Sequence, residues 1–148
     1  MSDFVTKYAM RYHEIISEAF WNRNKQIVVD VAVTALAAKH NPFTTSTWFD
    51  IPPISKDAVA KAIVDGRLES TPNDDDSPRS GFTQFHVERI AYLVVHPDLK
   101  PLRISVYTGS PELVDGNHRL AAAIYRGDET IKIDFPGSTG QLKQWLGK

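Results

Sequence analysis

The sequence contains no cysteine, which excludes disulfide bonds, thiolate metal sites and cysteine catalysis for this chain. It has no run that approaches the ~20 apolar residues of a membrane helix. The formal net charge of -1 leaves no excess of basic residues for a dominant nucleic-acid or membrane surface. The start, Met1 to Phe4, lacks the basic and apolar regions of a signal peptide. We therefore expect a cytoplasmic protein with no membrane contact.

What the sequence does contain is enough apolar material for a folded core: 42% of its 148 residues are hydrophobic. Apolar residues recur with helical spacing from Phe4 to Trp21 and again from Ile27 to Leu36, and Pro42 ends the second run. These runs predict an N-terminal helical hairpin over residues 1–43. The β-branched and aromatic residues of Thr44–Asp50 then predict a short strand.

The remainder, within a predicted domain of residues 44–148, alternates between helical and strand patterns. In order, the sequence predicts a helix between Ser55 and Gly66, a helix from Phe82 to His96, a hairpin of strands Leu102–Tyr107 and Glu112–Asp115, a helix over Leu120–Tyr125, a strand over Ile131–Phe135, and a last helix opened by a capping box at Ser138. The expected fold class is α+β, with a small mixed β-sheet and packed helices.

The most informative segment joins the second strand of this hairpin to the next helix and reads Asp115-Gly116-Asn117-His118-Arg119. Glycine at such a junction allows a tight turn and a close approach to a ligand. Two basic side chains in the first turn of a helix oppose its dipole unless a negative group is nearby. A bound phosphate would supply that charge, because helix N-termini are natural phosphate sites.

A purely structural alternative exists for the same five residues. Asp115 would cap the helix, and Arg119 would fold back onto its carboxylate as a local ion pair. The residues of the segment alone leave these two interpretations open.

The stretch from about His86 to Gly147 resembles the ParB/sulfiredoxin superfamily. The resemblance lies in the order of elements and in a Gly-x-His-Arg-x-x-Ala signature, which Gly116, His118, Arg119 and Ala122 match. It implies a sulfiredoxin-like fold in the C-terminal half of the chain. In that superfamily, the residues that match Gly116, Asn117, His118 and Arg119 bind nucleotide phosphates.

The chain also departs from both namesakes of the superfamily. Asn117 stands where sulfiredoxins carry their catalytic cysteine, so sulfiredoxin chemistry is excluded. ParB partition proteins carry a Gly-Glu-Arg-Arg type of motif at this place and a DNA-binding domain behind it. Because the motif differs here and the sequence ends soon after it, we do not expect a full partition protein. What the resemblance leaves is the nucleotide-handling core.

The resemblance implies a nucleotide site for ATP, ADP or CTP with Mg²⁺, and NTP hydrolysis or phosphoryl transfer as its activity. Arg119 would hold phosphate oxygens through its planar guanidinium, and His118 would donate a hydrogen bond to them. The backbone N–H groups around Asn117 and Gly116 would complete the cradle. Asp115 would bind the magnesium ion. A carboxylate base would be Glu88 or Glu112, between which the sequence does not choose.

Two rival functions stay open. A ParB-like DNA nuclease belongs to the same superfamily, but the charge balance does not favour DNA as a partner. The other rival is a non-enzymatic interaction module, in which the N-terminal helices would bind a protein partner.

Overall fold

The computed structural model describes residues 26–72, 78–106 and 109–147. These residues belong to two compact units. Among the described residues, the sheet unit takes in 26–30, 101–106, 109–115 and 132–147, and the helical unit takes in 31–72, 78–100 and 116–131. The predicted domain boundary at residue 43 depends on N-terminal residues outside the described ranges and stays a prediction.

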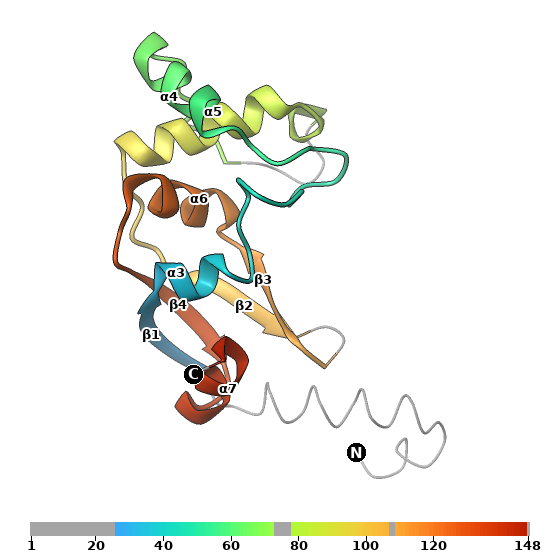
Figure 1. Ribbon diagram of the computed structural model, residues 1–148, viewed down its shortest axis with the longest axis vertical. Helices are drawn as coiled ribbons and strands as arrows, with labels where there is room; N and C mark the ends of the chain where they lie inside the picture. The colour runs from blue at the N-terminus through green and yellow to red at the C-terminus, as the bar shows by residue number, and fades with distance from the viewer. Residues whose placement is uncertain (1–25, 73–77, 107–108, 148) are drawn as a thin grey trace. The chain divides into compact units, whose positions relative to one another are not determined.

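The sheet unit is built on a mixed sheet of four strands, whose order across the sheet is β1-β4-β2-β3 (Figure 1). The strands are β1 (Gln26–Ala32), β2 (Leu102–Val106), β3 (Pro111–Asp115) and β4 (Thr130–Pro136). β2 and β3 form the predicted antiparallel hairpin, with Ile104 opposite Leu113, whereas β2 and β4 run parallel. The predicted α+β class with a small mixed sheet is therefore confirmed.

Alternate residues of the sheet are buried. Leu102 and Ile104 in β2, and Ile133 and Phe135 in β4, are at most 1% exposed. The ring of Phe135 meets that of Trp145, with centroids 5.8 Å apart. Trp145 belongs to α7 (Thr139–Leu146), so this contact joins the last helix to the sheet.

α7 begins with the predicted capping box. The Ser138 hydroxyl accepts the backbone N–H of Gln141 at 3.2 Å, and the side-chain oxygen of Gln141 accepts the N–H of Ser138 at 2.7 Å. Two N–H groups that the first turn leaves without helical partners are satisfied in this way.

We expect Ser138→Ala to lower the free energy of unfolding by about 1 kcal/mol, because the N–H of Gln141 loses its acceptor. Urea denaturation followed by circular dichroism measures the change. Ser110→Ala, at an exposed serine, is the matched control and should change stability by less than about 0.5 kcal/mol. Equal losses in the two variants would contradict the capping role.

The helical unit contains α3 (Val33–Ala37), α4 (Lys56–Asp65), a 3₁₀ turn η1 (Pro78–Gly81), α5 (Thr83–Val95) and α6 (Asn117–Arg126). α4 starts where Ser55 caps the N–H of Ala58 and ends at Gly66, whose φ of 71° suits glycine. α4, α5 and α6 and the segment before α4 share one apolar core. Its buried members are Ile51, Ile54, Val59, Ala62, Val87, Ile90, Ala91 and Ala121.

The prediction of a helix over Ile27–Leu36 is wrong for its first part, which forms β1; only Val33–Ala37 is helical. Alternate side chains of β1 turn inward, and Val31 is buried while Val28 is 54% exposed. β-Branched residues suit this half-buried strand, which pairs with β4. The predicted first helix, Phe4–Trp21, lies outside the described residues, so the N-terminal hairpin is not confirmed.

The strand predicted over Thr44–Asp50 is also wrong, because this segment forms successive turns. The Asn41 carbonyl accepts the backbone N–H groups of Thr44 and Thr45, and the Asn41 side chain accepts the N–H of Phe43 at 3.0 Å. Local bonds of this kind compete with strand pairing. The turns carry Trp48 to the core of the helical unit.

Among the described residues, no helix has the length and apolar character needed to cross a bilayer.

Candidate functional site

The predicted strand–loop–helix junction is confirmed: β3 ends at Asp115 and α6 begins at Asn117. Gly116 between them has a φ of 105°, a left-handed conformation that would strain most other residues. Its carbonyl accepts the N–H of Leu120 at 2.8 Å, the first hydrogen bond of the helix. Gly116 itself is the N-cap residue, so the alternative that places Asp115 at the N-cap is wrong.

His118, in the first turn of α6, is paired with a histidine that sequence reasoning did not select. Its Nε2 atom lies 2.9 Å from Nδ1 of His86, which α5 carries. The two imidazole rings are nearly parallel, with an interplanar angle of 11°. His86 is completely buried. One ring therefore donates a hydrogen bond to the other inside the helical unit.

Two aromatic side chains enclose this imidazole pair. The Trp48 ring stacks on both imidazoles, with centroid distances of 4.3 Å to His86 and 4.5 Å to His118. Phe85 meets both rings edge-on, at interplanar angles of 80° and 90°. Stacked and edge-to-face pairs add to the energy of burial. The aromatic contacts thus restrict how either imidazole can turn.

Positive charge gathers around the pair. Arg119 donates from Nη1 to the carbonyl of Lys100 at 2.8 Å. Arg89 is only 9% exposed, and its Nη1 donates to the carbonyls of Glu69 and Ser70. Burial is the main cause that lowers the pKa of Arg89 from its usual range. These hydrogen bonds orient both guanidinium groups.

The environment of His118 strongly disfavours an imidazolium ion. Burial, first, and then the neighbouring His86, Arg89 and Arg119 lower the pKa of His118 to about 3. His118 is therefore neutral at physiological pH. The contributions of Arg89 and Arg119 also indicate a positive electrostatic potential at the ring, which favours an anionic neighbour.

The other predicted residues lie on β3 and α5. Asp115 is exposed, belongs to the sheet unit and lies opposite Arg103 in the register of the β2–β3 hairpin. Of the two candidate bases, Glu88 is held by Arg67 at 2.9 Å, and Glu112 is exposed on β3. The structure describes no contact between His118 and either Glu88 or Glu112.

Sequence reasoning missed His86, Trp48 and Arg89. The signal for His86 was present, because His86, Ile90 and Leu93 share the helical spacing of one buried face of α5. A buried histidine on such a face needs a hydrogen-bond partner. No sequence signal pairs it with His118, 32 positions later.

A resident metal ion finds little support in the described residues. Within residues 26–72, 78–106 and 109–147, no group of three or more His, Asp or Glu side chains could hold one. The imidazole pair supplies two nitrogens, but the nearby arginines disfavour a cation. The surroundings of the pair suit an anion better.

Comparison with known proteins gives one curated match. The transcriptional regulator NovG of Streptomyces niveus is 44% identical over 57 residues. That segment is 38% of this chain and 17% of NovG, so the match spans a small part of the regulator. No protein-family model matches the chain, and no solved structure matches it. The resemblance to the ParB/sulfiredoxin superfamily therefore stays a prediction.

Proposed function

We propose that this chain binds the phosphate groups of a nucleotide, ATP, ADP or CTP, at the N-terminus of α6. The supporting observation is the positive potential around His118, to which Arg89 and Arg119 both contribute. The first N–H groups of α6 add the positive end of the helix dipole. Gly116 allows a close approach of the ligand to the backbone.

Each residue then has a distinct task. The N–H groups of Asn117 and its neighbours bind phosphate oxygens, as helix N-termini do. Arg119, fixed by its bond to the Lys100 carbonyl, adds a charge-assisted contact. His118 contributes a neutral hydrogen bond, because its pKa is far below physiological pH. Binding is thus a matter of positioned donors, which is also what phosphoryl transfer needs.

Hydrolysis or phosphoryl transfer would require a magnesium ion that bridges the phosphates. Magnesium is commonly held by one or two carboxylates, phosphates and water, and no all-protein cage is needed. Asp115, directly before Gly116 in the chain, is the carboxylate we assign to it. Mg²⁺ supplies charge neutralisation when bound, and the chain's own residues orient the phosphates.

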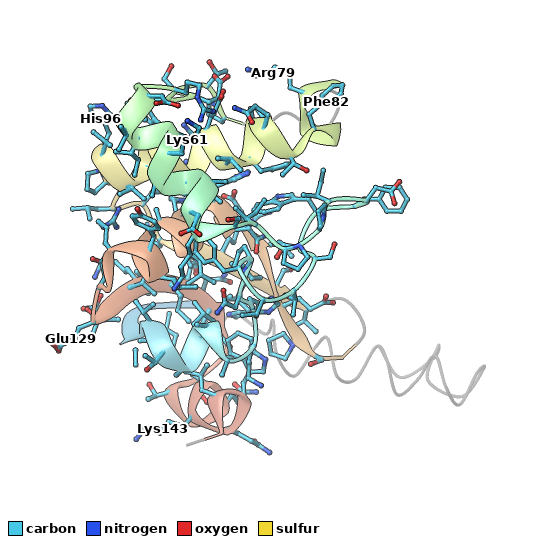
Figure 2. All side chains as sticks on the ribbon, turned by 45° about the horizontal axis from the view of Figure 1, so that its top comes forward. Lys61, Arg79, Phe82, His96, Glu129 and Lys143 are labelled. Carbon is cyan, nitrogen blue, oxygen red and sulfur yellow. The ribbon has the colours of Figure 1, made fainter. Side chains whose placement is uncertain are left out.

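Arg119→Gln is the test of the phosphate site. We expect it to weaken binding of ATP, ADP or CTP at least about 10-fold, because a charge-assisted phosphate contact contributes about 1.5–3 kcal/mol. Isothermal titration calorimetry measures the affinity. Lys61→Gln removes the same charge from the exposed face of α4 and is the matched control (Figure 2). Binding unchanged in Arg119→Gln, or absent in the wild type, would overturn the proposal.

A second candidate function is that of a regulatory module without catalysis. The match to a transcriptional regulator is the observation that favours it. Such a module would bind the nucleotide but release no phosphate in the presence of Mg²⁺, which a phosphate-release assay detects. The ParB-like nuclease stays a third alternative. Plasmid cleavage with Mg²⁺ or Mn²⁺ that is lost in Asp115→Asn would favour that nuclease.

A further inference from the structure

The imidazole pair determines which atom of His118 can reach a ligand. The Nε2 atom of His118 is engaged with Nδ1 of His86 at 2.9 Å. A hydrogen bond from the His118 ring to a guest must therefore come from Nδ1. That nitrogen can donate only when it carries the ring proton.

The proton between the two rings allows two arrangements. In one, Nδ1–H of His86 donates to Nε2 of His118, and His118 keeps its own proton on Nδ1. In the other, His118 donates from Nε2, and its Nδ1 presents a lone pair. A third arrangement with both His118 nitrogens protonated is disfavoured by burial and by Arg89 and Arg119.

We infer that His86 is a positioning residue of the anion site: its Nδ1–H donates to His118 and so holds the proton of His118 on Nδ1, ready for an anionic guest. This inference rests on the proposed function, because the phosphate oxygens of that ligand are acceptors and need a donor there. The reverse arrangement would turn a lone pair toward the phosphate and repel it. His86 therefore acts on the ligand only through His118.

The packing around the pair suits this role. His86 is completely buried, and Trp48 stacks on both rings at interplanar angles of 23° and 20°. The edge of the cluster is closed by Phe85, whose ring centroid is 5.2 Å from that of His86. Turning the His86 ring over would keep its plane against Trp48 but would carry Nδ1 away from His118 and break their hydrogen bond. A partner that is fixed in this way selects one nitrogen of its neighbour.

Nitrogen NMR of the wild-type chain tests the inference without any substitution. Long-range ¹H–¹⁵N spectra distinguish imidazoles protonated on Nδ1 from those protonated on Nε2. With inorganic pyrophosphate as the probe, we expect His118 in the Nδ1–H form both before and after binding, and a shift of its Nδ1 resonance that saturates as pyrophosphate binds. If pyrophosphate binds but His118 is protonated on Nε2, the inference about His86 is overturned, and the proposed function stands. No binding of pyrophosphate would overturn the proposed function and the inference with it.

Two substitutions of His86 separate positioning from packing. Asparagine places an amide N–H about where Nδ1–H of histidine lies, whereas leucine fills the space and donates nothing. We expect His86→Asn to bind pyrophosphate within about 3-fold of the wild type and His86→Leu at least about 10-fold more weakly. His96→Asn, at the exposed C-cap of α5, is the matched control. Thermal unfolding checks that both variants are folded. If folded His86→Asn and His86→Leu bind pyrophosphate with equal affinity, the positioning role is refuted.

Discussion

Trp48→Ala is expected to lower the free energy of unfolding by about 2–4 kcal/mol. Trp48 is partly buried, packs against the core of the helical unit and stacks on both His86 and His118. Its removal deletes a large apolar surface and two ring contacts, and it admits water to the imidazole pair. Since burial is the main cause of the low pKa of His118, that pKa should rise in the variant.

Urea denaturation measures the stability change, and NMR titration of the imidazole resonances measures the pKa. The neighbouring residue provides the control, because the Phe49 side chain is 90% exposed. Phe49→Ala should change stability by less than about 0.5 kcal/mol and leave the His118 titration unchanged. If the two aromatic substitutions proved equally harmless, Trp48 would not hold the pair together.

The elements that the sequence predicts correctly are those that local chemistry determines. α6 ends at Gly127, which adopts a φ of 78°, and α7 begins at the Ser138 capping box. The hairpin of β2 and β3 follows from alternation of apolar and polar residues. The junction at Gly116 combines both signals, so the strand–loop–helix context of the motif is predictable without a structure.

The elements that the sequence predicts wrongly depend on partners far away in the chain. Ile27, Val29 and Val31 fit either a buried helix or a strand, and pairing with β4, about a hundred residues later, decides for the strand. The ion pair between Lys132 and Asp30, at 3.0 Å, lies between the same two strands. Tertiary context of this kind overrides local propensity.

In the candidate site, too, some residues can be predicted from the local sequence and others depend on distant parts of the chain. Gly116, His118 and Arg119 can be selected because they are contiguous and chemically unusual. His86 and Trp48 reach the site from a different helix and from a loop predicted as a strand. In these surroundings burial, first, and then His86 and the neighbouring arginines lower the pKa of His118 from 6.5 to about 3, so the ring stays neutral even in mild acid. A sequence motif therefore names a residue, but its neighbours in space set its protonation state.

Acidification should destabilise the fold through His118. The pKa of His118 is about 3 when folded and near its ordinary value of 6.5 when unfolded. Between these values the unfolded chain binds one more proton, so the free energy of unfolding decreases as the pH falls. We expect a loss of about 1.6 kcal/mol between pH 6.5 and pH 5, and little contribution from His118 above pH 7.5. Urea denaturation at closely spaced pH values measures this slope.

His118→Gln provides the control, because the glutamine amide lies near the position of Nε2 and can keep the bond to His86 without a titrating ring. The variant should lose most of the slope between pH 6.5 and pH 5. The window stops at pH 5 because Glu69, whose pKa is also lowered in the folded state, destabilises the fold on protonation at lower pH. An unchanged slope in His118→Gln, or a His118 resonance that titrates near pH 6.5 in the folded wild type, would contradict a neutral imidazole enclosed beneath Trp48.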